Sequence, residues 1–189
     1  MRLPEIASEN QNIEPPRQAR WSAIAASCQG ILDAVPAAAY TCDASGLITY
    51  FNPVAEAIWG RAPKLHDWDE RYCGSHRLYS LDGAAIRHEE CWMALALLQG
   101  HPYNGREIVI ERRDGTRTVG EAYAHPLRNA QGQIVGALNL VADITGLRGN
   151  SLRYSKLHHP SIAYSATLAM IEIAVSILTL MTWENCTFN

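Results

Sequence analysis

Residues 125–145 read HPLRNAQGQIVGALNLVADIT, and this stretch decides the fold. The segment Arg128–Gly132 has the Asn, Gln and Gly composition of a turn. After it, apolar residues continue to Val141 in a length that suits a strand. Side chains alternate along a strand, so one face carries Ile134, Gly136, Leu138 and Leu140, and the other carries Val135, Ala137, Asn139 and Val141. The stretch therefore predicts the last hairpin of an antiparallel sheet.

Four more strands and two helices are predicted upstream of this hairpin. Residues 37–52 (AAAYTCDASGLITYFN) form a strand, a turn at DASG and a second strand, and residues 104–115 and 116–127 meet at the turn Asp114-Gly115. Asn52, Pro53 and Gly60 cap, begin and end a short helix, and a second helix covers residues 88–99 before Gly100. Residues 61–87 are predicted to be irregular. This order predicts an α+β fold, with a five-stranded antiparallel sheet, helices covering one face, and helical extensions at both ends.

The predicted domain organisation has four parts. Residues 1–19 are a polar, proline-containing leader, and residues 20–34 form a helix with apolar residues at helical spacing. Residues 35–146 form the domain. Residues 147–189 form a linker and an apolar C-terminal helix.

Composition excludes several classes of protein. The chain has 189 residues, 48% of them apolar, so it can form a core without metals or disulfides. A net charge of −3 with scattered basic residues argues against a nucleic-acid partner. Five cysteines do not suggest a disulfide framework, and free thiols fit a reducing cytoplasm. The first twenty residues contain no apolar segment typical of a secretory signal, so a cytoplasmic location is expected.

The order of strands and helices, together with the cap and turn motifs between them, resembles a PAS domain over residues 31–145. The pieces that carry the resemblance are NPVAEAIWG (52–60), ERRDGTR (111–117) and the stretch 125–145, which ends in Asp143-Ile144-Thr145. The resemblance implies that these last three residues transmit a signal from the sheet into an output helix. It also implies that Asp143 pairs with a basic side chain on the sheet, for which Arg112, Arg113 and Arg117 are candidates.

The middle segment narrows the resemblance. The residues LYSLDG (78–83) and CWMALAL (91–97) are similar to an LYxxDG…CPMAxAL pattern in PAS sensor modules of bacterial HWE-type sensor histidine kinases. The chain departs from the pattern at Trp92, where the family has Pro, and at His76, where an aromatic residue is expected. By this resemblance the chain is a sensory module of two-component signalling, with a histidine kinase or another signalling protein as partner and a homodimer formed through the helix at 20–34. No kinase core follows residue 145, so the chain is not expected to be an enzyme.

A pocket for a small ligand is expected between the helices and the sheet. Its predicted lining comes from the first, third and last strands and from the second helix. These residues are Tyr40, Cys91, Leu95, Ile108, Ile110, Leu138 and Leu140. A filled core without a ligand would need the same apolar residues, so the sequence leaves both interpretations open.

Two alternative sites involve cysteine and histidine. Cys73, His76, His88 and Cys91 have the types and spacing of a tetrahedral zinc site, which would make the chain a zinc-stabilised interaction module. His88 alone, at the start of a helix, could ligate haem and make the chain a gas or redox sensor. Ordinary packing competes with both hypotheses, and no bound cofactor is the main expectation. A flavin is not expected, because RYCGSHR (71–77) does not match the flavin-binding GxNCRFLQ stretch.

The C-terminal residues 161–183 are apolar, with Glu172 as the one charged residue. Their length suits a membrane span, but Glu172 would lie near its middle. A helix that docks on a partner or on a second copy is one alternative hypothesis, and a remnant of a truncated kinase is another.

Overall fold

The computed structural model describes residues 28–149 and 162–180. Four predicted segments lie outside these residues: the leader, residues 20–27 of the N-terminal helix, the linker at 150–161 and the end of the tail. Residues 28–34 are helical and precede the first strand. The labelled elements that follow are β1 (Ala38–Asp43), β2 (Ile48–Phe51), α2 (Pro53–Trp59), β3 (Arg77–Tyr79), β4 (Ala85–Ile86), η1 (His88–Glu90), α3 (Trp92–Gln99), β5 (Tyr103–Glu111), β6 (Arg117–Arg128), β7 (Ile134–Asp143), α4 (Thr145–Gly149) and α5 (Ile162–Leu180).

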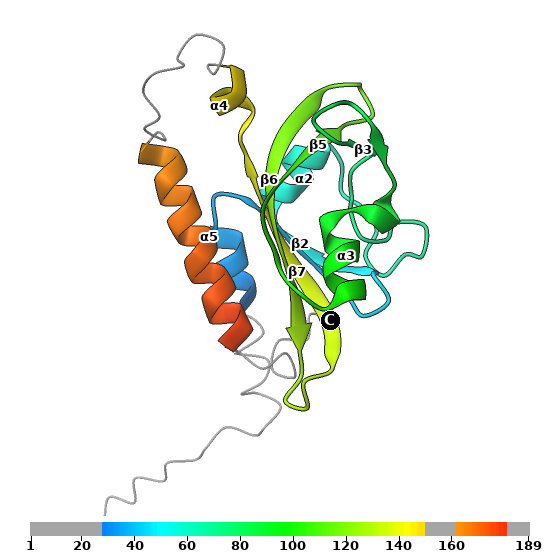
Figure 1. Ribbon diagram of the computed structural model, residues 1–189, viewed down its shortest axis with the longest axis vertical. Coiled ribbons are helices and arrows are strands. Elements are labelled where there is room, and N and C mark those ends of the chain that lie inside the picture. The colour runs from blue at the N-terminus through cyan, green and yellow to red at the C-terminus, as the bar shows by residue number, and fades with distance from the viewer. Residues whose placement is uncertain (1–27, 150–161, 181–189) are drawn as a thin grey trace, which may run out of the picture.

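The described strands form one antiparallel sheet in the order β2-β1-β7-β6-β5-β3-β4 (Figure 1). The predicted α+β fold is confirmed, but the predicted number of five strands is wrong, because the described sheet has seven. The two additional strands, β3 and β4, come from the segment predicted to be irregular. They are three and two residues long, too short to show the apolar alternation that marks a strand in a sequence.

Asn52 fixes the start of α2 and joins it to two other segments. Its Oδ1 accepts hydrogen bonds from the backbone N–H groups of Ala55, at 2.9 Å, and Ala39, at 3.0 Å. Its Nδ2 donates to the carbonyl oxygens of Leu32 and Ala37, both at 2.9 Å. The buried side chain thus connects the N-terminal helix, β1 and α2, with all its hydrogen-bonding groups satisfied.

The helix before β5 is shorter than predicted. Residues 88–90 form a 3₁₀ turn, and α3 begins at Trp92 rather than at His88. Its end agrees with the prediction, because Gly100 adopts the left-handed conformation, with φ at 70°, that closes the helix after Gln99.

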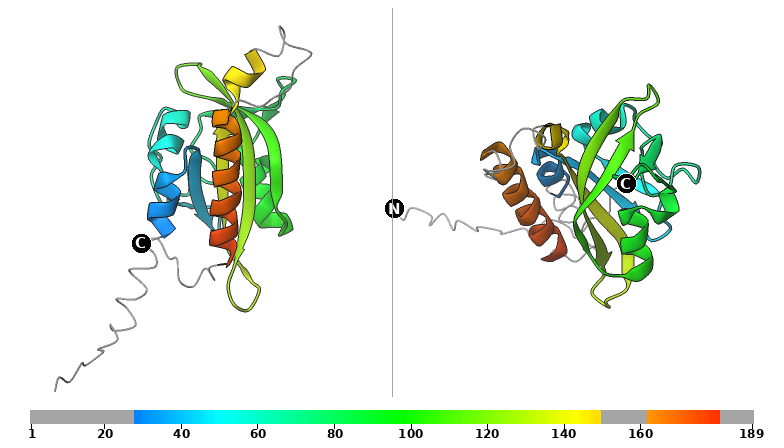
Figure 2. Two further views of the ribbon diagram at one scale, coloured as in Figure 1. Left: turned by 90° about the vertical axis from the view of Figure 1, so that its left-hand side faces the viewer. Right: turned by 45° about the horizontal axis from the view of Figure 1, so that its top comes forward.

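Helices cover both faces of the sheet within the described residues (Figures 1 and 2). On one face, α2 packs against β1, and α3 packs against β6 and β7. This core includes Tyr40, Trp59, Met93, Ile108 and Val141. On the other face, the residue 28–34 helix and α5 cover a second core, which includes Leu32, Tyr50, Leu138, Leu140 and Ile171.

Helix α5 is a docked helix in this structure. Ile171 and Ala174 are buried against the sheet, whereas Met170 and Ile173 are exposed. Among the described residues, no helix combines the length and apolar character needed to cross a membrane.

Candidate functional site

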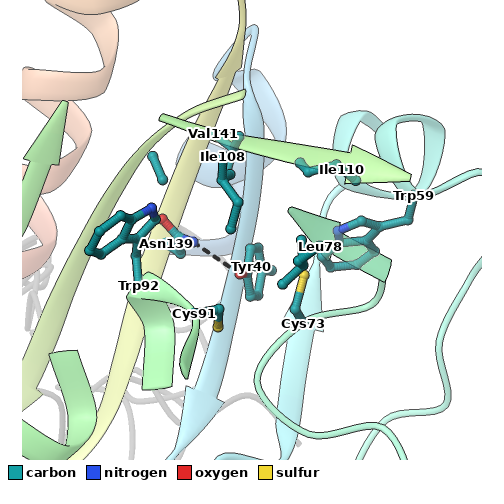
Figure 3. Close-up of a pocket in the computed structure, with 11 residues that line it drawn as sticks. Tyr40, Trp59, Cys73, Leu78, Cys91, Trp92, Ile108, Ile110, Asn139 and Val141 are labelled. Carbon is teal, nitrogen blue, oxygen red and sulfur yellow. Dashed lines mark hydrogen bonds between the residues drawn. The ribbon is translucent and has the colours of Figure 1, made fainter. Parts of the chain in front are cut away.

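A small cavity lies between α3, the end of α2 and the sheet (Figure 3). It encloses about 20 Å³, which is room for roughly one water molecule. The lining residues are Tyr40, Trp59, Cys73, Leu78, Cys91, Trp92, Ile108, Ile110, Ala122, Asn139 and Val141. Pockets that hold drug-sized ligands have volumes of about 300 Å³ or more, so most of the space between helices and sheet is filled by side chains.

The predicted lining residues separate into two groups. Tyr40, Cys91, Ile108 and Ile110 line the cavity. Leu95 is half-buried and lies outside the lining.

Leu138 and Leu140 require a correction. They lie in the second core, on the opposite face of the sheet from the cavity. Strand β7 has apolar residues on both faces because helices cover both. The neighbouring positions Asn139 and Val141 are therefore the ones that line the cavity.

Asn139 is a polar residue of the cavity wall that the sequence interpretation missed. Its side chain is 4% exposed, and its Nδ2 donates a hydrogen bond of 2.9 Å to the hydroxyl of Tyr40. No hydrogen-bond donor in the described part of the chain reaches its Oδ1. The sequence did contain a signal, since Asn139 is a single polar residue in an apolar strand. A buried amide needs hydrogen-bond partners at both ends, so such a residue marks a polar position in the core.

Burial keeps the ionisable groups of the cavity neutral. It raises the pKa of Cys91 to about 12, and it also raises the pKa of Cys73 and of Tyr40, the latter well above its usual range. A nucleophilic cysteine needs a lowered pKa, so these thiols are part of a neutral wall. Cys42, Cys73 and Cys91 are free, as expected, but Cys28 is disulfide-bonded, which corrects the expectation of free thiols at that residue.

A hydrogen-bonded chain links Cys73 to the surface. The Cys73 thiol donates to Oγ of Ser75 at 3.3 Å, and the same Oγ lies 3.2 Å from Nε2 of His88. Burial lowers the pKa of His88, which favours the neutral ring that can accept a hydrogen bond from Ser75. The spacing of cysteines and histidines in the sequence could not reveal these hydrogen bonds, because the residue that joins Cys73 to His88 is a serine, Ser75.

The four candidate zinc ligands do not meet. Cys73 and Cys91 line the internal cavity, whereas His76 and His88 line an open surface groove of about 280 Å³ beside β3 and β4. Within residues 28–149 and 162–180, no three His, Cys, Asp or Glu side chains are grouped as metal ligands. The structure therefore lends no support to a zinc site built from these residues.

A family model described as the PAS fold matches residues 32–149. The chain belongs to the PAS family. The match covers the whole sheet, α2, α3 and α4.

Solved PAS domains are similar to the chain at low sequence identity. One from Colwellia psychrerythraea is 22% identical, with 64% of this chain and 97% of that chain covered and a TM-score of 0.42. The PAS domain of an HTR-like protein from Haloarcula marismortui is 21% identical, with 68% and 98% covered and a TM-score of 0.44. The PAS domain of the fruit-fly ELK potassium channel is 16% identical, with 64% and 96% covered and a TM-score of 0.49. No curated protein sequence matches the chain.

Haem and flavin do not fit this PAS cavity. A space of about 20 Å³ cannot enclose either group, and His88 lies in the surface groove rather than in the cavity wall.

The end of the last PAS strand differs from its predicted arrangement. Asp143 forms no ion pair with Arg112, Arg113 or Arg117 among the contacts of the described chain. Its Oδ1 instead accepts a hydrogen bond from the backbone N–H of Thr145 at 2.9 Å. The two arginines that have partners bind elsewhere: Arg117 pairs with Glu111 at 2.7 Å, and Nε of Arg112 donates to the carbonyl of Ile58 at 3.0 Å.

Ile144 and Thr145 hold this strand end to β6. The N–H of Ile144 donates to the carbonyl of Val119, and Oγ1 of Thr145 accepts from the N–H of the same residue, both at 2.9 Å. Ile144 is 5% exposed, while Asp143 and Thr145 are exposed. The segment therefore continues the β6–β7 pairing directly into α4.

Proposed function

We propose that this chain is a sensory and signal-transduction module of bacterial two-component signalling that acts on a separate kinase. Membership of the PAS family is the observation that carries the proposal, because domains of this family serve as sensory modules in the kinases whose LYxxDG…CPMAxAL pattern the chain resembles. The chain contributes no phosphorylation chemistry of its own in this proposal. It is similar in residues 78–97 to the sensor part of HWE-type histidine kinases.

The proposed output runs through the end of β7. Asn139 in the cavity wall and Asp143 at the start of the junction lie on the same strand, four residues apart. A strand transmits a displacement along its length because its hydrogen bonds to both neighbours hold it as a unit. Asp143, Ile144 and Thr145 would pass such a displacement to α4 and to the segment beyond it.

Two copies are proposed to associate through the helix at residues 20–34. Cys28 and Leu32 already face the sheet of their own chain. The exposed side of the same helix, with Gln29 and Asp33, is the side left for a partner. Light scattering of the full chain tests this part: a mass of two chains is expected, and a strict monomer at micromolar concentration would refute it.

The kinase-control function is tested by autophosphorylation assays. Each histidine kinase of the same genome is incubated with labelled ATP, with and without the full chain. At least one kinase should change its rate when the chain is added, while the chain alone should take up no label. A set of kinases that are all indifferent to the chain would contradict the proposal.

A matched pair of variants links that effect to the junction. Asp143→Ala removes the carboxylate that accepts a hydrogen bond from the backbone N–H of Thr145. Asp114→Ala removes the equivalent interaction at the β5–β6 turn, where Oδ1 of Asp114 accepts from the backbone N–H of Thr116 at 2.9 Å. The first variant should weaken the effect on the kinase and the second should leave it intact.

A further inference from the structure

One buried carbonyl oxygen in the cavity wall has no partner. Asn139 is held at its nitrogen end by the Tyr40 hydroxyl, while Oδ1 is unpaired among the described residues (Figure 3). In the orientation that the structure gives the carboxamide, the unpaired end is an acceptor, so its partner is a donor; the reverse orientation would need an acceptor there instead. Buried polar atoms are nearly always hydrogen-bonded, so this atom marks a position where a partner binds.

Two of the neighbouring donors are already engaged. The indole Nε1 of Trp92, another residue of the wall, donates to the carbonyl of Glu107 at 3.3 Å. The Cys73 thiol donates to Ser75. The other donors of the wall do not reach Oδ1 either, so its partner must come from outside the described side chains.

The size of the cavity limits that partner. About 20 Å³ admits one molecule of the size of water. Such a molecule would also find weaker hydrogen-bonding groups around it, since the Tyr40 hydroxyl and the Cys91 thiol share the same wall.

The charge of the wall limits it as well. None of the described residues in the lining is an Asp, Glu, Lys, Arg or His, and burial raises the pKa of Tyr40, Cys73 and Cys91 so that all three are neutral at pH 7. A buried ion without a counter-charge is strongly disfavoured. The ligand is therefore neutral.

We propose that the cavity binds one neutral hydrogen-bond donor of water's size, with an O–H or N–H directed at Oδ1 of Asn139. This deepens the proposed sensory function, because it names the class of ligand that the site accepts. Trp92 is the half-buried member of the wall, while Tyr40, Ile108 and Ile110 are buried, so the ligand enters beside Trp92.

Water itself is the probe in the first test. Crystal structures of the full chain are compared for the wild type, Tyr40→Phe and Asn139→Leu. The wild type should show one isolated peak of density within hydrogen-bond distance of Oδ1. The peak should persist in Tyr40→Phe, which keeps the acceptor, and disappear in Asn139→Leu, which replaces the amide by an apolar group of similar shape. An empty cavity in the wild type, or a peak that survives in Asn139→Leu, would overturn the proposal.

A solution measurement keeps the test independent of the variants. In the labelled wild-type chain, magnetisation transfer should connect a long-lived water to the backbone amides beside Asn139 and Ala122, and the absence of such transfer would count against the site. Neither measurement involves a kinase. A hydrated cavity combined with kinases that ignore the chain would reject the proposed function alone, and a dry cavity with a responsive kinase would reject this inference alone.

Discussion

The hydroxyl of Tyr40 on β1 accepts a hydrogen bond from Nδ2 of Asn139 on the neighbouring strand β7 at 2.9 Å, between residues 99 positions apart in sequence. Both side chains are almost completely buried, at 2% and 4% exposure. The pair therefore joins the first and last strands of the domain at the wall of its cavity.

Removal of the Tyr40 hydroxyl should leave the amide without its protein partner. Tyr40→Phe is expected to lower the free energy of unfolding by about 1–3 kcal/mol, the usual cost of an unsatisfied buried polar group. The double variant Tyr40→Phe with Asn139→Leu should lose less than the sum of the two single variants, because no orphaned group remains. Urea unfolding of the four proteins measures this, and strictly additive losses would show that the two residues are not coupled.

Asn52 should be among the least replaceable residues of the chain. Asn52→Asp keeps the two acceptor interactions but loses both donors and faces two carbonyl oxygens with a buried carboxylate. We expect a loss of at least about 3 kcal/mol at pH 7. Asn129→Asp is the control, because Asn129 also accepts from two backbone N–H groups but lies in a surface turn; its loss should stay under about 1 kcal/mol. Chemical denaturation followed by circular dichroism compares the two, and similar losses would contradict this account of Asn52.

His88 should make the protein less stable in mild acid. Burial lowers its pKa in the folded state below the ordinary value of 6.5, so the unfolded chain binds more protons in this range. The contribution is fully present above pH 6.5 and is lost as the pH falls from 6.5 toward the lowered pKa. His88→Gln removes the titration, so its free energy of unfolding should fall less between pH 7 and pH 5 than that of the wild type.

Exposed His101 provides the control for this pH dependence. Unfolding of His101→Gln, measured across the same pH range, should follow the wild-type curve. Equal slopes for His88→Gln and the wild type would contradict the role given to burial. Burial also lowers the pKa of His125, and its contribution cancels because it is common to all three proteins.

Docking of α5 should depend on one side of that helix. Ile171 is fully buried against the sheet, and Ile173 is 59% exposed. Ile171→Glu should release α5, with faster hydrogen exchange in residues 162–180 and a loss of at least about 2 kcal/mol, the lower end for removing a buried Ile side chain. Ile173→Glu should change the free energy of unfolding by less than about 0.5 kcal/mol. Comparable effects of the two substitutions would mean that α5 does not pack as described.

Local sequence signals predicted the parts of the fold that depend on local chemistry. Asn52, Pro53 and Gly60 placed α2 correctly, since capping and left-handed closure involve residues a few positions apart. The end of α3 at Gly100 and the turn at Asp114-Gly115 were predicted correctly for the same reason. Strand β3 was missed because its pairing with β5 is a long-range property, and β4, which pairs with β3, is only two residues long.

The choice of face on β7 could not be made from the sequence. Leu138 and Leu140 have the composition expected of a core face, and they do form a core, but it is the one beneath α5. Asn139 and Val141 face the cavity instead. An alternating strand identifies its two faces but not the helix that covers each, and here both are covered. The partner of Asp143 was also unpredictable, because Thr145 competes for it through a local backbone N–H.

Native mass spectrometry of the full chain, purified without refolding, tests the central claim most directly. A sensory PAS module with a cavity for one water-sized neutral donor should give the mass of two polypeptides with no added organic group. An additional mass the size of haem or a flavin that is released on denaturation would contradict the account.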